Sequence, residues 1–420
     1  MIKLLDRILS ALEEGSSKGD STAVLIHLVD QSKAFSRQDN TLTIKSFQKN
    51  GVRSCLIPIL TSFFENRRMV VKWRGTMSEV KTLPGGAAMG SSLGIYSFLS
   101  QSNSIANTVP EDDRYKFVDD LTIMERISLV NVGLASYNVK AHVPSNIADH
   151  NQMIPGEHLT SQKYMEDIKT WTDENKMKLN EKKTKNMIFN FSTNKQFSTD
   201  IRVNGEVIET VKEARLLGTI ISDDLKWEKN TQYLVKDSNK RMRLLHNATN
   251  FTRNTQHLKQ IYMLNVRCKL EQAAPVWHHS LTKADCSSLE RVQKTAVRVI
   301  LKDRYKNYED GLKILKLDSL EKRRNKLTLN LAKSSLKLEK MRQLFPMNSS
   351  DCQMERRNFE KFKVRKARTE RFKNSAVISM QNMLNEEENV KLKTYKNVIS
   401  PVLRTCGSSE SISLRKFTYK

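Results

Sequence analysis

The pattern of apolar and polar positions divides the chain into a mixed first half and a helical second half. Apolar residues at helical spacing predict a helix over residues 2–14. A nearly continuous apolar run over residues 23–29 predicts a strand that is covered on both faces. Asp30 follows this strand directly. A buried strand that ends in a carboxylate can hold a charge at a cleft, so Asp30 is a candidate functional residue.

Two apolar runs meet at a pair of carboxylates in residues 114–124. The pattern predicts a tight β-hairpin with Asp119 and Asp120 at its turn. We expect the apolar residues beside the turn to be buried, namely Phe117, Val118, Leu121 and Ile123. Burial of these flanks would hold two like charges close together, and such a pair resists full ionisation unless a cation neutralises it.

The Asp-Asp dipeptide alone does not identify a metal site. It also occurs at 112–113 and 223–224 and is common in surface turns. What favours a metal at Asp119 and Asp120 is the further carboxylate of Asp30, which arrives at the end of another apolar strand. The sequence therefore predicts a divalent cation bound between these two segments.

The remaining pattern of the first half alternates strands, turns and helices. Strands are expected over residues 68–73, 185–191 and 215–222, a helix over 159–172, and a hairpin over 201–208 around Asn204-Gly205. A stretch rich in glycine and small residues, 83–94, precedes an amphipathic run. Such a stretch lets backbone N–H groups approach a phosphate or a base, and a flexible turn is the alternative.

The second half is helical and basic. Helical periodicity dominates from residue 227 to about residue 344. The following segment, 346–420, crowds lysine and arginine around Phe359, Phe362 and Phe372. Basic residues interleaved with aromatics suit single-stranded nucleic acid. A helix whose phenylalanines pack on the preceding domain fits the same residues equally well, and the sequence leaves both interpretations open.

The composition of the chain indicates the class of partner that it binds. The chain has 420 residues, enough for two or three domains. Its 71 Lys and Arg residues against 46 Asp and Glu residues give a net charge of +25, which favours a polyanionic partner. A basic protein that is merely soluble is the alternative.

Cysteine usage and hydropathy bear on the compartment. The five cysteines show no CxxC spacing, so we expect neither a zinc site nor a disulfide framework. No apolar run reaches the roughly 18 residues of a membrane span, and the first residues lack the core of a signal peptide. We therefore expect an intracellular protein without a membrane partner.

Five motifs in order carry a resemblance to a known family. They are Asp30 with Ser32-Lys33-Ala34-Phe35, Gly90-Ser91-Ser92-Leu93-Gly94, Phe117-Val118-Asp119-Asp120, Leu179-Asn180 with Lys183-Thr184, and Leu216-Leu217-Gly218. This set resembles the palm of reverse transcriptases from non-LTR, LINE-type retrotransposons. The resemblance implies an α+β fold: a right-hand polymerase palm, an antiparallel sheet with packed helices, over residues 1–225 with partial fingers. A helical thumb-like region over 226–345 and a basic C-terminal tail over 346–420 would follow.

The resemblance also implies an activity and its cofactors. The chain would be an RNA-directed DNA polymerase of a retrotransposon that uses two-metal nucleotidyl transfer. Asp30, Asp119 and Asp120 would be catalytic, and Asp30 and Asp119 would bind two Mg²⁺ or Mn²⁺ ions. The implied partners are an RNA template, a DNA primer and deoxynucleoside triphosphates.

Further positions receive roles from the resemblance alone. Phe35 would shape the sugar pocket, the Gly90 loop would line the template and nucleotide, and Lys183 would lie near the leaving pyrophosphate. Leu216, Leu217 and Gly218 would support the primer end.

The chain departs from the family pattern at three points. Ala88-Met89 stands where the family has Pro-Gln, and Ser36 stands where many relatives have an aspartate. Only 29 residues precede Asp30, so most of the fingers and any endonuclease are expected to be absent. A truncated and weakly active or inactive enzyme is therefore expected. A non-catalytic nucleic-acid-binding protein derived from a retroelement is the alternative, and a basic α/β scaffold is a third.

Overall fold

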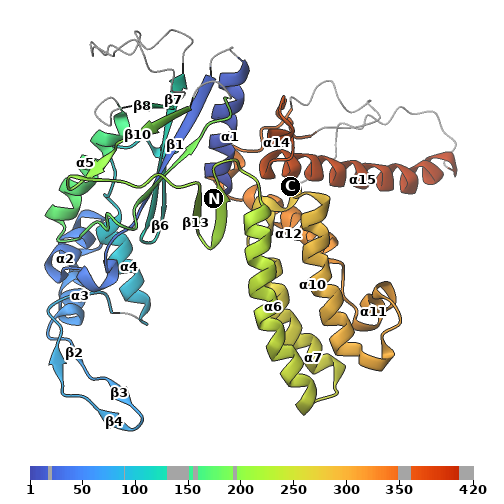
Figure 1. The fold of residues 1–420 in the computed structure, drawn as a ribbon, viewed down its shortest axis with the longest axis horizontal. Helices are drawn as coiled ribbons and strands as arrows, with labels where there is room; N and C mark the ends of the chain where they lie inside the picture. The colour runs from blue at the N-terminus through green and yellow to red at the C-terminus, as the bar shows by residue number, and fades with distance from the viewer. Residues whose placement is uncertain are drawn as a thin grey trace. The chain divides into compact units, whose positions relative to one another are not determined.

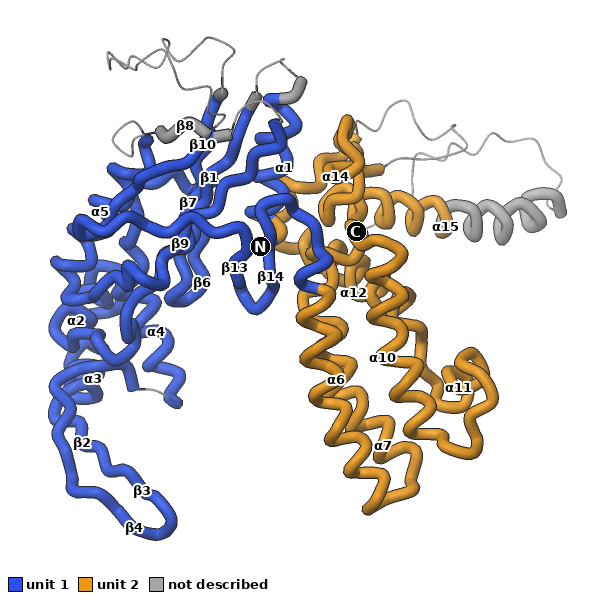
Figure 2. The backbone as a smooth tube through the Cα atoms, viewed as in Figure 1, with its two compact units in different colours: residues 1, 3–230 blue, residues 2, 231–420 orange. Residues whose placement is uncertain are grey.

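The computed structural model describes residues 1–17, 21–88, 90–129, 151–154, 159–192, 196–348 and 361–405. The chain divides into two compact units, Met1 with residues 3–230 and Ile2 with residues 231–420 (Figure 2). The described part of the first unit mixes helices with sheets, and that of the second is mainly helical. The mixed helix-and-sheet class is confirmed, whereas the assignment of palm and thumb stays a prediction.

An antiparallel sheet lies at the centre of the first unit. Its strands, in the order β6-β7-β1-β9, are β6 (Arg114–Phe117), β7 (Asp120–Leu129), β1 (Ser21–Val29) and β9 (Lys185–Phe189). Strand β1 is an interior strand, and its residues 23–27 are buried on both faces. The strand predicted over residues 23–29 is therefore confirmed, and its nearly continuous apolar run follows from this position.

Helices cover this sheet and build the rest of the unit (Figure 1). They are α1 (Ile2–Ser17), α2 (Asn40–Lys49), α3 (Ile57–Phe64), α4 (Ser92–Ser102) and α5 (Thr160–Glu174). The main hydrophobic cluster joins Leu25 of β1 and Ile123 of β7 to Ile168 of α5. The helices predicted over 2–14 and 159–172 are thus confirmed, each extending by two or three residues.

Short strands form smaller pairs in the first unit. They are β2 (Arg68–Met69) with β5 (Lys81–Thr82), β3 (Lys72–Trp73) with β4 (Thr76–Met77), β8 (Asn151–Ile154) with β10 (Gln196–Thr199), β11 (Arg202–Val203) with β12 (Glu206–Val207), and β13 (Glu213–Leu216) with β14 (Thr219–Ser222). Only the pair of β8 and β10 is parallel among these described strands. The hairpin predicted around Asn204-Gly205 is confirmed, with both residues at positive φ.

The single strand predicted over residues 215–222 is wrong. Leu217 and Gly218 adopt φ angles of 49° and 82°, which reverse the chain between β13 and β14. Two consecutive positive φ angles make the tight turn that suits the twist of a hairpin. The apolar run of this segment therefore folds as two short strands.

The second unit consists of helices. They are α6 (Glu228–Phe251), α7 (Thr255–Tyr262), α8 (Cys268–Leu270), α9 (Ala274–Trp277), α10 (Lys283–Leu301), α11 (Tyr308–Leu315), α12 (Leu320–Ser335), α13 (Glu339–Arg342), α14 (Glu370–Lys373) and α15 (Ala376–Thr405), where α6 begins in the first unit. Gln293 of α10 links α7 and α11 because it accepts from the Tyr262 hydroxyl and donates to the Tyr308 hydroxyl, at 2.6 and 2.8 Å. Within the described ranges, none of the helices has the length and apolar character needed to span a membrane.

Of the phenylalanines Phe359, Phe362 and Phe372 singled out in the sequence, two belong to the core of the second unit. Phe362 is buried beside Phe345 and Met380, and Phe372 is buried below the Arg365 guanidinium, which lies 5.4 Å from the ring centroid. Packing is therefore the interpretation that holds for these two rings. Phe359 lies outside the described residues.

Candidate active site

The strand register places Asp30 between two other segments. The ladder between β1 and β7 ends at the pair Val29 and Leu121, so the next position sets Asp30 opposite Asp120. On the other side, the ladder between β1 and β9 ends at Leu28 and Lys185, and Gln31 forms the next bridge with Leu179, so the loop that carries Lys183 lies beside Asp30. The sheet thus brings together three residues that are far apart in sequence.

The predicted hairpin carries the two other carboxylates. β6 and β7 meet at a turn formed by Val118 and Asp119, and Asp120 is the first residue of β7, opposite Phe117. Val118 has a φ of 58°, a left-handed value that is costly for a β-branched residue and tends to persist at functional sites.

The burial predicted beside this turn is only partly confirmed. Leu121 and Ile123 are buried, but Phe117 is 62% exposed. Phe117 is the last residue of the edge strand β6. Because an edge strand has no neighbour on one side, its end can leave an apolar side chain in solvent.

The charges of Asp30 and Asp119 act on the carboxyl group of Asp120. Partial withdrawal of the Asp120 carboxyl group from solvent raises its pKa, and the negative charges of Asp119 and Asp30 raise it further. Proximity of like charges disfavours the ionised form. The carboxylates are therefore close enough to repel one another, as the sequence predicted.

The other two Asp-Asp pairs differ from this one. Asp112 and Asp113 pair with Lys3 and Arg7, at 3.0 and 3.5 Å. Asp224 accepts hydrogen bonds from the Ser222 hydroxyl and the Lys226 N–H, which hold its pKa low. In the part of the chain that the structure describes, no ion pair involves Asp30, Asp119 or Asp120. Asp112, Asp113 and Asp224 thus each have a lysine or arginine within 4 Å, whereas burial and the charge of Asp224 raise the pKa of Asp223.

A tight loop fixes Lys183 beside Asp30. The Asn180 N–H donates to the Asp30 carbonyl at 2.9 Å, and the Asp30 N–H donates to the Thr184 hydroxyl at 3.2 Å. The loop is closed by the Lys183 N–H, which donates to the Asn180 carbonyl at 3.1 Å. These bonds hold the Leu179-Asn180 and Lys183-Thr184 motif against Asp30, although the two segments are far apart in sequence.

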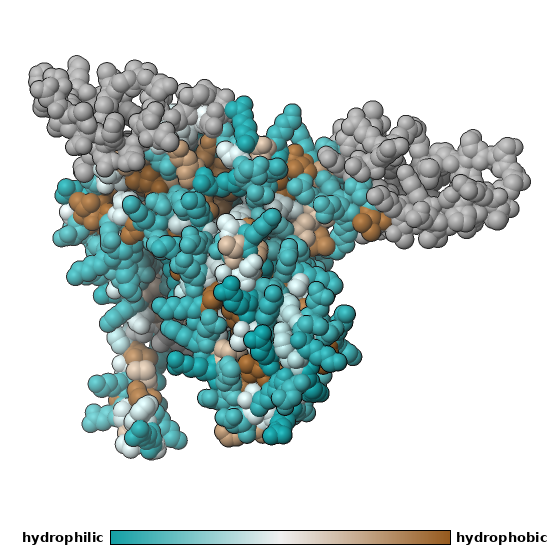
Figure 3. Space-filling model, turned by 45° about the vertical axis from the view of Figure 1, so that its right-hand side comes forward, coloured by the Kyte–Doolittle hydropathy of each residue, from teal (hydrophilic) through white to brown (hydrophobic). Residues whose placement is uncertain are grey.

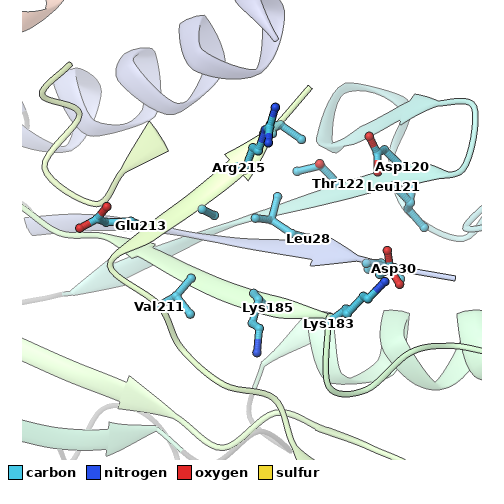
Figure 4. A pocket seen from close by; sticks show the side chains of 13 residues that line it. Leu28, Asp30, Asp120, Leu121, Thr122, Lys183, Lys185, Val211, Glu213 and Arg215 are labelled. Carbon is cyan, nitrogen blue, oxygen red and sulfur yellow. The ribbon is translucent and has the colours of Figure 1, made fainter. Parts of the chain in front are cut away.

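One cavity joins these segments. It has a volume of about 310 Å³, and its lining includes Asp30, Asp120, Lys183, Arg215 and Leu216. Figure 4 shows the Lys183 side chain extending toward Asp30, with Asp120 and Thr122 on the neighbouring strand. The cavity therefore combines carboxylates with cations.

The predicted primer residues lie at this cavity in part. Leu216 lines it, and Leu217 and Gly218 form the turn that follows in the β13–β14 hairpin. Arg215 also lines the cavity and was missed by sequence reasoning. No sequence pattern indicated this role, because adjacent side chains of a strand normally point to opposite faces.

Phe35 and the glycine-rich stretch lie beside the carboxylates rather than in the cavity lining. Phe35 stacks on Phe98 with ring centroids 4.5 Å apart, in a cluster that includes Val118 of the aspartate turn. The Phe35 carbonyl accepts the Ala87 N–H at 2.7 Å, which attaches the stretch to the segment after Asp30. Gly90 is exposed at a φ of 86° just before α4.

Gly94 has a steric reason for being glycine. A Cβ atom there would collide with the Ala88 carbonyl. Met89, the position of one departure from the family pattern, lies outside the described residues.

The residues present fit a hard divalent cation. Mg²⁺ and Mn²⁺ prefer carboxylate oxygens, and a cation between Asp30 and Asp119 would relieve the repulsion that raises the Asp120 pKa. Among the described residues, no group of three or more His, Cys, Asp or Glu side chains is arranged to hold a metal. A cation here would therefore complete its shell with water or substrate oxygens, as Mg²⁺ commonly does.

Comparisons with known proteins give weak likenesses. No protein-family model matches the chain, and no curated protein sequence does. Apo telomerase from Candida tropicalis is similar at a TM-score of 0.35 and 13% identity, over 75% of this chain and 49% of that one. Telomerase from Candida albicans with a fragment of telomeric RNA is similar at a TM-score of 0.33 and 10% identity, over 82% of this chain and 54% of that one. The chain thus spans about half the length of these structures, and likenesses at these scores carry no assignment.

Proposed function

We propose that the chain is a weakly active reverse transcriptase that adds deoxynucleotides to a DNA primer on an RNA template. The observation that carries this proposal is the convergence of four separate segments on one cavity, which supply Asp30, Asp120, Lys183 and Leu216. These residues come from four of the five motifs that resemble the LINE-type family. The same order of motifs supports an origin in a non-LTR retrotransposon.

Each residue has a task in the proposed reaction. Asp30 and Asp119 would hold divalent cations, which when bound activate the primer hydroxyl and neutralise the reacting phosphates. Lys183 would supply positive charge to the outer phosphates of the nucleotide, because its side chain extends toward Asp30 (Figure 4). The β13–β14 hairpin would support the primer end, and Arg215 would contact a primer phosphate.

Phe35 would contact the sugar of the incoming nucleotide and select deoxynucleotides. Its ring stacks on Phe98, in a cluster against which Val118 of the aspartate turn also packs. A fixed aromatic wall would exclude a 2′-hydroxyl by contact. We expect Phe35→Val to admit ribonucleotides, and unchanged sugar selectivity would contradict this role.

The test is extension of a labelled DNA primer on a poly-A template with Mg²⁺. Asp30→Asn and Asp119→Asn should lower the rate at least about a hundredfold, since misplaced reactants lose rate on this scale. Asp112→Asn is the matched control because it alters another Asp-Asp pair, one that a lysine neutralises. Equal rates in all three variants and the wild type would refute the proposed role of the site.

A non-catalytic nucleic-acid-binding protein is the second candidate. It is favoured by the lack, among the described residues, of a ready-made group of three metal ligands. Binding of primer–template without any extension by the wild type would select this candidate.

A further inference from the structure

A β-ribbon projects from the first unit, and nothing in the proposed reaction uses it. This arm, residues 67–83, consists of β2, β3, β4 and β5, and it extends away from α3 (Figure 1). Arg74 and Gly75 form its tip with φ angles of 47° and 88°, which suit a tight hairpin turn. The sequence predicted only a single strand over 68–73 here.

The arm exposes an unusual amount of apolar surface. Every residue from 71 to 82 is exposed, and Trp73 is 71% exposed. The other large apolar side chains that it exposes are Met69, Val71, Met77 and Val80, and Figure 3 shows hydrophobic residues along the projection. A two-stranded ribbon is marginally stable alone in water, and an exposed apolar cluster of this kind marks a contact surface.

The charge of the arm indicates what it contacts. Its exposed charged residues are Arg68, Lys72, Arg74 and Lys81 against one acid, Glu79. The Arg74 guanidinium lies 5.7 Å from the centroid of the Trp73 ring. A second copy of this arm would meet like charge, whereas a polyanion would meet complementary charge.

The root of the arm is fixed to the site region. Arg67 donates to the carbonyls of Gly85 and Gly86, the former at 3.1 Å, and lies over the Phe64 ring. The Gly86 N–H in turn donates to the Gln38 carbonyl at 2.7 Å. The arm is thus anchored to the glycine-rich stretch and to the segment that follows Asp30.

We propose that the arm binds single-stranded nucleic acid, with a base stacked on Trp73 and the flanking phosphates neutralised by Lys72 and Arg74. Cations that track phosphates beside a ring that stacks on bases are the recurring means of holding single strands. The proposal shares its class of partner with the proposed function but requires no catalysis.

The test compares binding of a fluorescein-labelled single-stranded oligonucleotide by the full chain and its variants. Trp73→Ala should weaken affinity about tenfold, the usual scale for loss of one stacked base. Trp73→Phe should retain most of the affinity because a ring remains. Affinity of Trp73→Ala within about twofold of the wild type, or a change in self-association alone by sedimentation velocity, would overturn the proposal.

The phosphate contacts have their own readout. The pair Lys72→Gln and Arg74→Gln should lower the slope of log affinity against log salt by about 1.4, since each neutralised phosphate contributes about 0.7 for single strands. The matched control pair is Lys313→Gln and Lys322→Gln, two exposed lysines of the second unit. An equal loss of slope in both pairs would mean that net charge alone matters, which contradicts a specific arm contact.

Primer extension run in parallel separates this inference from the proposed reaction. Weak binding by Trp73→Ala without extension by any protein would support the arm and refute the polymerase. Normal extension together with unchanged binding by Trp73→Ala would support the polymerase and refute the arm.

Discussion

Glu125 caps a helix to which it does not belong, and its removal should destabilise the first unit. The first residues of α5 lack a local cap, because Leu159 at the N-cap position has no side-chain oxygen. Glu125 of β7 supplies it instead: its carboxylate accepts the N–H groups of Thr160 and Ser161, at 2.9 and 3.0 Å, and the Ser161 hydroxyl. A strand residue thus satisfies donors that a helix start leaves unpaired.

The structure sets the size of the effect. Thr160 is exposed, so water can replace the carboxylate at its N–H, whereas Ser161 is fully buried and would keep two unpaired donors. An unsatisfied buried donor costs about 1–3 kcal/mol, and loss of negative charge at a helix start adds about 0.3–1 kcal/mol. We expect Glu125→Ala to lower the free energy of unfolding by about 3 kcal/mol. Glu125→Gln should cost about 1 kcal/mol because its amide oxygen still accepts.

Urea unfolding followed by circular dichroism measures the loss, and hydrogen exchange of α5 amides locates it. Glu14→Ala is the control, since it removes a carboxylate in an exposed ion pair with Arg126, worth at most about 1 kcal/mol. A loss below about 0.5 kcal/mol in Glu125→Ala, or α5 exchange equal to the wild type, would refute the capping role.

Three further outcomes follow from the structure. Burial and the charges of Asp119 and Asp30 raise the pKa of Asp120, so Asp120→Asn should raise the melting temperature in EDTA and reduce the stabilisation by Mg²⁺; a lowered melting temperature in EDTA would contradict this. Burial lowers the pKa of His27 and lowers that of His278 to about 3. As the pH falls, these histidines therefore bind protons in the unfolded chain at a higher pH than in the folded chain. The stability that is present above about pH 6.5 should fall as the pH drops from there toward the folded pKa values. His278→Gln should flatten this fall in thermal melts, and an unchanged pH profile would argue against it. Gln293→Leu should lower the melting temperature, since it leaves the buried Tyr262 hydroxyl unpaired, at about 1–3 kcal/mol; an unaltered melting temperature would refute this.

The sequence predicted the elements that carry a strong local signal. The strand over 23–29 has a nearly continuous apolar run because it is interior to the sheet, and the aspartate turn lies between two apolar runs. Local sequence patterns do not determine that Asp30 lies beside Asp120 and Lys183. That juxtaposition depends on the register of β1 with β7 and β9, a long-range property. Carboxylates at the ends of apolar strands suggested that Asp30 approaches the aspartate turn, and only the resemblance suggested Lys183.

The sequence predictions that the structure contradicts failed for physical reasons. The β13–β14 hairpin reads as one strand because Leu217 holds a positive φ that apolar residues rarely adopt. The tip of the arm was missed for a similar reason, since Arg74 precedes Gly75 in a turn that favours Asn or Asp. The exposed Phe117 shows that an apolar residue at the end of an edge strand need not be buried.

Templated incorporation of a single nucleotide is a direct test of whether the chain is a reverse transcriptase. The full chain, a labelled DNA primer, Mg²⁺ and one deoxynucleoside triphosphate are combined on RNA templates that differ only in the first unpaired base. We expect the wild type to add the complementary nucleotide alone, and we expect this addition to be lost in Asp119→Asn but not in Asp112→Asn. No addition by the wild type, or addition that ignores the template base or persists in Asp119→Asn, would contradict it.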